Sequence, residues 1–394
     1  MTLFRTLSGT ALVLALSSFN SAYAVINPTA ATVSLRMTCT ENGAALNNCF
    51  TTPQSLTTWM AGTRRPNAAN PLRVEVGAGK ITGNGGKGVQ LAVQCDPANG
   101  YTGYTSFIGA GPAQSIIYAP NGIIAPVTIT SCTEMNFSEL GFVGAGGYGG
   151  TIVWSGGGNS SWNHVAINTT GYAWREECEP GAIRGNHYWT ASRLTAIVAV
   201  TAQLETYWSS CDESWFFGSE ITASSPTNAQ INSGNGVILG AWGAAVFANG
   251  NGIVHVYGSV IRALIDTPTS GFPAVSTSDN AEVHIHGTGI DLISTTGQNM
   301  IAIQAGAGSI VHANETAYNF VTTGTKTRIL NQGGHVHAPY FWQNHPEAPV
   351  ILSDNGADMS VVTANTSDGQ PHMVIYSSAC ASHWYDTVDR VCRQ

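Results

Sequence analysis

Apolar and polar residues alternate in short runs along much of the chain, with the two-residue period of a β-strand. The pattern is clearest between residues 246 and 340, where a Val-His motif returns four times. The histidines are His255, His284, His312 and His337, at intervals of 29, 28 and 25 residues. In each motif the apolar neighbours face one side of the strand and the histidine faces the other. The repeat predicts an apolar column inside the fold and a column of imidazoles outside it.

A second apolar position precedes each of these motifs. Val246, Val275 and Ile303 lie nine residues before their histidine, and Ile329 lies eight before His337. Turn-forming residues separate the two positions, because glycine, asparagine and aspartate tolerate the positive φ of a tight bend. One strand, one bend and one further strand per repeat are typical of a solenoid of stacked β-coils.

The N-terminal part of the chain contains the one short helix that we expect. The segment Thr52 to Met60 places Leu56, Trp59 and Met60 on one side of a helix. An apolar stripe of this kind needs a surface to cover, and the open end of a β solenoid has an unpaired strand edge and an exposed core. We therefore interpret this helix as an N-terminal cap.

The order of motifs after this helix resembles that of a known family. A strand and glycine bend, Val74-Glu75-Val76-Gly77-Ala78-Gly79, is followed by Phe107-Ile108-Gly109-Ala110-Gly111 and then by Ile116-Ile117. This arrangement is similar to the opening of the pectin lyase-like superfamily of pectate lyases, polygalacturonases and pectin methylesterases. The resemblance implies an all-β fold, a right-handed parallel β-helix, with a binding cleft formed by long loops near its middle.

Cysteines and the N-terminal residues indicate export. Residues 1–24 have Arg5 before an apolar run and end in Ala22-Tyr23-Ala24, which is typical of a signal peptide. We assign the β-helix and its cap to residues 25–344 and a capping tail to residues 345–394. Eight cysteines suit an oxidising compartment, either extracellular or periplasmic. Their sequence neighbours suggest four disulfides: Cys39–Cys49, Cys95–Cys132, Cys178–Cys211 and Cys380–Cys392, the last closing the C-terminal tail.

The charge of the chain limits its partners. After residue 24 the chain carries 14 basic and 23 acidic residues, and this acidic balance argues against non-specific binding of nucleic acid. No later stretch is long and apolar enough to predict a membrane-spanning helix. Hydroxyl and amide side chains instead predominate among the polar residues, as expected for the outer surface of an extracellular β protein.

The segment from Tyr172 to Glu220 interrupts the glycine-spaced pattern and concentrates aromatic and ionisable residues. Aromatic rings beside carboxylates suit sugars, which have an apolar face and many hydroxyls. We predict a catalytic set of Arg193, Glu205, His187, Tyr188 and Glu213. We predict that substrate contacts the side chains of Arg175, Tyr207, Trp208, Trp215, His284 and His286. The alternative is that these charges form loop salt bridges and a solvated face.

The catalytic signatures of the related enzymes are missing. Trp215-Phe216-Phe217-Gly218 resembles the aspartate strand of pectin methylesterases, but Ser214 stands where their nucleophile belongs. Ala241 replaces the arginine of their second motif, and the chain has neither the Asp-Asp pair nor the Asn-x-Asp strand expected of polygalacturonases. A lyase needs a base and a cation or arginine to neutralise a uronate. Calcium is therefore a possible cofactor, with carboxylates supplied by Glu176, Glu177, Glu179, Asp212 and Glu213.

The histidine column has three interpretations. Coils of a β solenoid are about 4.8 Å apart, so imidazoles of adjacent coils lie close enough to share a metal ion. His255, His284, His312 and His337 are the candidate ligands. The column is also consistent with a strip that contacts ligand, or with a structural ladder that repeats because its environment repeats. We found no aligned carboxylate to complete a metal site.

Two functions remain open from the sequence. The first is a secreted carbohydrate-active β-helix that binds or cleaves an extracellular, acidic polysaccharide by a lyase or hydrolase reaction. The second is a non-catalytic, adhesin-like structural solenoid at the cell surface. Digestion of a polysaccharide panel, followed by absorbance of unsaturated products and by reducing ends, separates the two.

Overall fold

The computed structural model describes residues 30–394 except for sixteen segments: 84–88, 120–126, 145–150, 170–172, 178–183, 198–206, 210–212, 225–243, 267–271, 339–340, 344–349, 353–357, 364–371, 377–383, 387–390 and 394. The signal-peptide prediction for residues 1–24 lies outside the described residues. So do Cys178, Cys211 and Cys380, and the two disulfides that involve them stay predictions.

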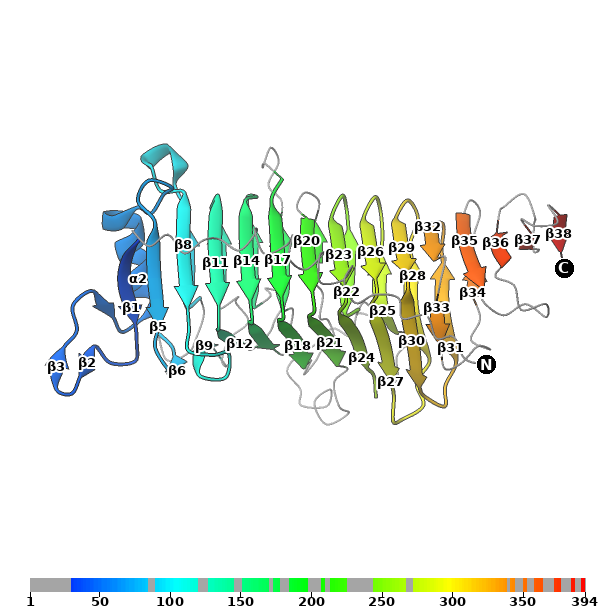
Figure 1. The fold of residues 1–394 in the computed structure, drawn as a ribbon, viewed down its shortest axis with the longest axis horizontal. Coiled ribbons are helices and arrows are strands. Elements are labelled where there is room, and N and C mark those ends of the chain that lie inside the picture. Colours follow the sequence, from blue (N-terminus) through cyan, green and yellow to red (C-terminus); the bar gives the residue numbers. More distant parts are fainter. Residues whose placement is uncertain are drawn as a thin grey trace, which may run out of the picture.

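Three long sheets run side by side along the molecule, and each coil of the chain adds one strand to each (Figure 1). We name the sixteen-stranded sheet A and the two ten-stranded sheets B and C. From β5 to β35 the strands enter the sheets in the repeating order A, C, B, so neighbours within a sheet are three strands apart in sequence. All of these neighbours up to β35 pair in parallel. The fold is therefore a parallel β-helix, as the sequence predicts, and its right-handed winding stays a prediction.

Sheet A is the longest of the three, with sixteen strands. In chain order its strands are β1 (Ala31–Leu35), β4 (Cys49–Phe50), β5 (Leu72–Val76), β8 (Gly103–Ile108), β11 (Glu134–Ser138), β14 (Asn159–Asn163), β17 (Asn186–Thr190), β20 (Glu213–Phe217), β23 (Ile253–Tyr257), β26 (Glu282–His286), β29 (Ile310–Asn314), β32 (His335–Ala338), β35 (Asp358–Thr363), β36 (His372–Tyr376), β37 (Trp384–Asp386) and β38 (Val391–Arg393).

Sheets B and C have ten strands each. Sheet B contains β7 (Leu91–Gln94), β10 (Val127–Thr130), β13 (Ile152–Ser155), β16 (Trp174–Glu177), β19 (Tyr207–Ser209), β22 (Val246–Asn249), β25 (Phe272–Thr277), β28 (Met300–Ala305), β31 (Lys326–Asn331) and β34 (Val350–Leu352). Sheet C contains β6 (Gly79–Ile81), β9 (Ser115–Ala119), β12 (Gly141–Gly144), β15 (Ala166–Thr169), β18 (Arg193–Ile197), β21 (Glu220–Ser224), β24 (Val260–Leu264), β27 (Gly289–Ile293), β30 (Thr316–Val321) and β33 (Phe341–Gln343).

The predicted cap is confirmed as a helix, α2 (Pro53–Trp59), that continues into a π-helical turn over Met60–Arg64. Thr52 caps it, since its hydroxyl accepts a hydrogen bond from the backbone N–H of Ser55. Leu56 and Met60 are fully buried. The helix packs against β4 and β7 at the N-terminal end of the coils (Figure 1). Smaller elements nearby are the hairpin β2 (Thr40–Glu41) and β3 (Ala44–Ala45), and a 3₁₀ turn at Pro97–Asn99.

Two of the predicted disulfides, Cys39–Cys49 and Cys95–Cys132, are present.

At the other end of the molecule, the parallel pairing passes the expected boundary at residue 344. Strand β34 pairs in parallel with β31, and β35 pairs with β32, before β36, β37 and β38 add antiparallel strands. Backbone hydrogen bonds sustain this pairing without the Val-His motif, which is why the sequence pattern ends earlier than the sheet.

Stacked side chains fill the interior of the coils. Under sheet A, one column runs in register through Phe107, Phe137, Trp162, Trp189 and Phe216. Its rings are parallel, with centroids 4.1 Å apart for Phe137 and Trp162 and 4.8 Å apart for the two tryptophans. Beyond Phe216 the same column continues as Val256 and Ile285. The large aromatic core therefore lies in the N-terminal half of the coils.

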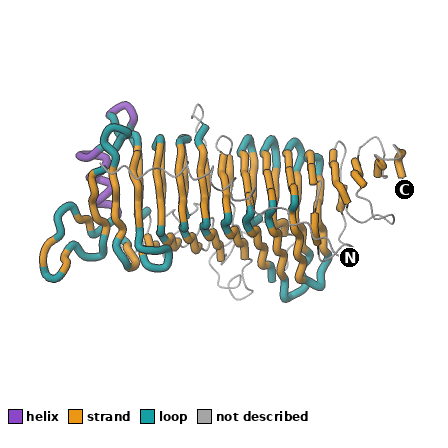
Figure 2. The backbone as a smooth tube through the Cα atoms, in the orientation of Figure 1, coloured by secondary structure: helices purple, strands orange, loops and turns teal. Residues whose placement is uncertain are grey.

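Tight bends join the sheets, and Figure 2 shows the loops between successive strands. The bend from sheet A to sheet C has one left-handed residue per coil, such as His164, Ala191, Gly218 and Gly258, with φ between 47° and 54°. The next residue donates its backbone N–H to a hydroxyl one coil further on. This serine ladder comprises four hydrogen bonds: Val165 to Ser192, Ser192 to Ser219, Ser219 to Ser259 and Ser259 to Thr288.

Candidate functional site

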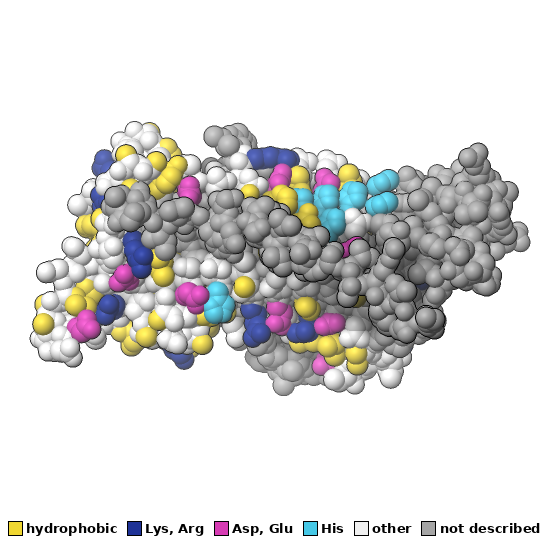
Figure 3. Space-filling model, in the orientation of Figure 1, with side chains coloured by type: hydrophobic (Ala, Val, Ile, Leu, Met, Phe, Trp, Pro, Cys, Tyr) yellow, Lys and Arg dark blue, Asp and Glu magenta, His cyan; other side chains and the backbone are white. Residues whose placement is uncertain are grey.

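The histidines of the repeat lie side by side on the outer face of sheet A, as the sequence predicts. Strand register pairs His255 with His284, His284 with His312, and His312 with His337. The upstream apolar positions also align on sheet B, where Val246 pairs with Val275. Figure 3 shows a gathering of histidine side chains at the surface over the strands of this part of sheet A.

The histidine column continues into aromatic residues in the preceding coils. His255 pairs with Trp215, and Trp215 pairs with Tyr188. A second column beside it contains Phe217, Tyr257 and His286. We name these two columns the sheet A strip; its residues are Tyr188, Trp215, Phe217, His255, Tyr257, His284, His286, His312 and His337.

From Tyr188 to His312, neighbouring rings of the strip stack on one another along the axis of the helix, whereas the ring of His337 is tilted by 60° to that of His312. The centroids of Trp215 and His255 are 3.7 Å apart, those of His255 and His284 are 4.6 Å apart, and both pairs are nearly parallel. Tyr257 and His286 stack in the same way at 4.9 Å. Stacked rings cover each other's faces, so the strip presents ring edges outward. Imidazole nitrogens and tyrosine hydroxyls are hydrogen-bonding groups on such edges, and His284 and His286 use theirs toward Glu282 and Asn314.

Charged side chains flank the strip. Glu213 lies on the same face, with its carboxylate oxygens 3.9 Å from Arg184 Nη1 and 3.9 Å from His255 Nε2. In the next coil but one, Glu282 Oε1 is 2.7 Å from His284 Nε2. Three of the residues predicted as site residues, Tyr188, Glu213 and Trp215, therefore lie together with the predicted His284 and His286.

Burial changes the proton affinity of the strip. The pKa of His255 falls to about 3 because the ring is buried and because His284 and His286 lie close to it. Burial also lowers the pKa of His286 and of His312. The pKa of Tyr188 is raised by burial and by the nearby Glu213 carboxylate. At neutral pH, the three imidazoles are uncharged and the tyrosine hydroxyl keeps its proton.

His187 lies inside the coil, contrary to its predicted catalytic role. Its side chain is fully buried, its Nδ1 is 2.7 Å from Ser160 Oγ, and its Nε2 is 3.7 Å from the buried Glu176. The Trp162 indole donates a hydrogen bond to the same Ser160 oxygen. The line of serine, histidine and glutamate resembles a nucleophile with its base, but a polymer cannot reach it. Tyr188 faces outward because adjacent residues of a strand face opposite sides.

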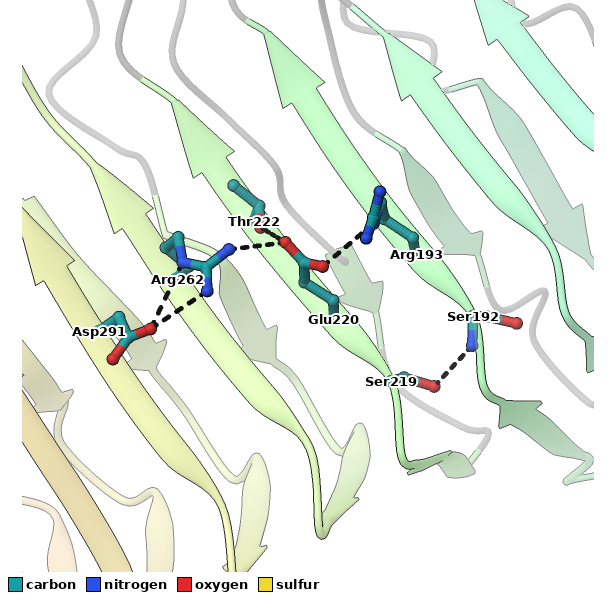
Figure 4. A network of polar contacts seen from close by, with 7 residues as sticks. All are labelled: Ser192, Arg193, Ser219, Glu220, Thr222, Arg262 and Asp291. Atoms are coloured by element: carbon teal, nitrogen blue, oxygen red, sulfur yellow. Dashed lines mark hydrogen bonds and ion pairs between the residues drawn. The ribbon is translucent and has the colours of Figure 1, made fainter. Parts of the chain in front are cut away.

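Arg193 lies on the outer face of sheet C, in a network of alternating charges (Figure 4). Its Nε is 3.0 Å from Glu220, and Glu220 in turn is 2.7 Å from Arg262. Arg262 then contacts Asp291 at 3.2 Å. A groove of about 560 Å³ runs beside this network along the bend between sheets A and C. Every charge in the network has a partner of opposite sign.

The remaining predicted residues belong to sheet B or lie outside the described residues. Arg175 is half-buried on β16, and Tyr207 and Trp208 belong to β19. Glu205 lies outside the described residues, as do Glu179 and Asp212 of the expected carboxylate group. Glu176 points into the core and Glu213 points out from sheet A. The predicted calcium site therefore does not gather these two carboxylates.

One carboxylate beside the histidine column was missed by the sequence analysis. In the part of the chain that the structure describes, one group of three His, Cys, Asp or Glu side chains has its ligand atoms within 4.8 Å of one another: Glu282, His284 and His312. The signal was present in Glu282-Val283-His284, since residues two apart on a strand share a face. His337 and His255 are neighbours of this group in the same column.

The fold and this surface together define a class, a parallel β-helix with an outward strip of stacked aromatic and imidazole rings. Comparison with family models, with curated proteins and with solved structures found no match to the chain. The function must therefore be argued from the surface itself. Among the residues that the structure describes, no helix has the length and hydrophobicity to cross a membrane.

Proposed function

We propose that this protein is a secreted β-helix that binds an extracellular polysaccharide along the sheet A strip. The observation that carries the proposal is the register of Tyr188, Trp215, His255 and His284, which places one ring per coil in a continuous column. A linear polymer lying along the axis of the helix follows this column and meets partly exposed polar side chains at Tyr188, Glu213 and His284. The resemblance of the N-terminal motifs to the pectin lyase-like superfamily supports the same class of ligand.

The chemistry of the strip favours contacts with hydroxyl groups. Imidazole edges and the Tyr188 hydroxyl donate and accept hydrogen bonds, which matches the hydroxyls of a sugar chain. Glu213 and Glu282 give the strip carboxylates, and Arg184 supplies a cation beside the first of them. One sugar stacks best at Tyr188, whose ring is next in register to the small Ser161 in the preceding coil. Trp215, His255 and His284 each have a stacked ring on both sides.

Binding accounts for the described geometry better than catalysis does. Of the predicted catalytic residues, His187 is in the core and Arg193 is on sheet C, while Tyr188 and Glu213 are on the outer face of sheet A. The raised pKa of Tyr188 disfavours the phenolate that a general base requires. The predicted catalytic set is therefore divided, and only Tyr188 and Glu213 of these four residues lie on the strip.

Affinity measurements on a panel of neutral and acidic polysaccharides test the proposal. We expect Trp215→Ala to weaken binding of the recognised polymer about tenfold, because a stacked ring of the strip is lost. Tyr118→Ala is the matched control, since Tyr118 is a half-buried aromatic residue on the outer face of sheet C. This control should change the affinity less than twofold.

Two results would overturn the proposal. The first is an equal loss in the two variants, which would show that the strip is not the binding surface. The second is absence of binding across pectin, alginate, glycosaminoglycans and neutral glucans. That second result would favour the adhesin-like structural solenoid.

A further inference from the structure

Three potential metal ligands meet at one position of the sheet A strip. Glu282 and His284 both project outward from β26, and His312 projects from β29 directly beside His284. The carboxylate oxygen Glu282 Oε1 is 2.7 Å from His284 Nε2. One ligand atom from each of the three side chains lies within 4.8 Å of the others. All three residues are half-buried, so the group is accessible from solvent.

The composition of this group suits a transition metal. Two imidazoles and one carboxylate form a ligand set that binds zinc and related divalent ions, with metal–nitrogen distances of about 2.0–2.1 Å. The rings of His284 and His312 are nearly parallel at 4.8 Å, with an interplanar angle of 7°. Modest rotation of the side chains brings the three ligand atoms around one ion. Calcium and magnesium prefer oxygen ligands, so the two imidazoles select against them.

The register explains why the group occurs at this coil. The position that Glu282 occupies on β26 is filled by Ile253 on the preceding strand and by Ile310 on the following one. Glu213 holds that position one coil earlier than Ile253, but its neighbour on the strand is Trp215. Among the carboxylates of the described strip, Glu282 is therefore the one that lies two residues from a histidine, His284, and one coil away from another, His312.

We propose that Glu282, His284 and His312 bind a divalent transition-metal ion of the zinc class. The three side chains leave at least one coordination position facing outward, where water or an oxygen of a second ligand completes the shell. The site belongs to the protein alone and needs no polysaccharide. Its test can therefore succeed or fail independently of the binding function proposed above.

The experiment uses full-length protein purified without a polyhistidine tag and stripped with a chelator. Equilibrium dialysis against Zn²⁺, followed by elemental analysis, should find one tightly bound ion per chain. Co²⁺ should give the visible absorption bands of a site with nitrogen and oxygen ligands. Glu282→Gln and His312→Asn should each weaken Zn²⁺ binding at least tenfold.

A matched control is available elsewhere on the molecule. His164 Nδ1 lies 2.7 Å from Glu139 Oε2, a similar pair of imidazole and carboxylate for which no third ligand lies close by in the described chain. His164→Asn should leave the stoichiometry and affinity for Zn²⁺ unchanged. Far-ultraviolet circular dichroism of every variant verifies that the coils are intact.

Three results would overturn the proposal. They are less than one tightly bound ion per chain, unchanged affinity in both ligand variants, and equal weakening by His164→Asn. Adding Glu282→Asp provides a further check, because a shortened carboxylate should recover part of the affinity that Glu282→Gln loses.

Discussion

The outer faces of sheets A and C have the same strand geometry but carry different side chains: stacked neutral rings on sheet A and charges of opposite sign on sheet C. On both faces each coil places one side chain directly beside its counterpart in the next coil. On sheet A these neighbours are alike, as in the stack of Trp215, His255 and His284. On sheet C the direct neighbours have opposite charges, as in Arg193 beside Glu220 and Arg262 beside Asp291. Glu220 also contacts Arg262, which lies diagonally across the sheet from it (Figure 4).

The difference teaches which side chains a β solenoid can repeat. Adjacent strands are about 4.8 Å apart, and like charges at that distance repel. Rings can therefore repeat from coil to coil only while they are neutral, and charges can repeat only with alternating sign. The sheet C network satisfies its own charges, whereas the outer edges of the sheet A strip still have hydrogen-bonding capacity. For this reason we place ligand binding on sheet A.

Acid should destabilise the folded protein by protonating the histidine stack of sheet A, which is neutral at pH 7. Between about pH 6.5 and pH 3 the unfolded chain binds a proton at His255 that the folded chain does not, because burial and neighbouring histidines lower the folded pKa to about 3. Stability therefore falls as the pH falls through this window. His255 alone should cost roughly 3 kcal/mol at pH 4 relative to pH 7 in metal-free protein.

Urea unfolding of His255→Phe measures this contribution. The variant keeps the stacked ring but cannot be protonated, so its free energy of unfolding should depend less on pH than that of the parent protein. His164→Phe, at an exposed histidine outside the strip, is the comparison variant. If parent and His255→Phe lose stability in parallel, protonation of the stack is not the cause.

Removing the central carboxylate should break the alternation on sheet C. Glu220→Gln leaves Arg193 and Arg262 beside a neutral side chain, with no anion between them. We expect a loss of about 1 kcal/mol in the free energy of unfolding at low ionic strength, since the pairs are partly exposed. The loss should shrink in 1 M NaCl, where charges are screened within about 3 Å.

The control for this measurement is Glu139→Gln, which removes the carboxylate of a single exposed pair with His164. That variant should change the stability less than Glu220→Gln does. A Glu220→Gln effect that is equally large at high and low salt would assign the loss to packing and not to charge.

The smallest expected effect concerns one hydroxyl of the sheet A strip. Tyr188→Phe should weaken polysaccharide binding about threefold, the typical value of one neutral hydrogen bond. The ratio should be the same at pH 6 and pH 9, because burial and Glu213 raise the pKa of Tyr188 and keep its proton in place at both values. Tyr118→Phe is the control on sheet C. An effect that grows between pH 6 and pH 9 would instead indicate a phenolate with a chemical role.

The period of the sequence predicts the architecture well. The Val-His motif predicts the register of four coils, since each valine must face the core and each histidine must then face outward. Positive φ at Gly250, Asp279, Gly308 and Gly333 follows the predicted bends between sheets B and A. These features are local, and one repeat is enough to reveal them.

The candidate site was harder to predict because closeness along the chain is misleading in a solenoid. Arg175, Tyr188 and Arg193 lie within nineteen positions of one another in the sequence, yet they belong to sheets B, A and C. Spatial neighbours are instead about one coil apart. The orientation of His187 could have been inferred from Trp189, because an apolar residue two positions away shares its face and points to the core.

The serine ladder at the bend between sheets A and C also has a consequence for how such a chain can change length. Its hydrogen bonds join residues 27 positions apart in two coils, 40 apart in the next and 29 apart in the one after. The interval from Ser219 to Ser259 is thirteen residues longer than the interval from Ser192 to Ser219, yet the hydroxyl of one coil still lies opposite the amide of its neighbour. Loops can therefore grow, and whole coils can be added, while the hydrogen bonds of the serine ladder keep successive coils in the same alignment.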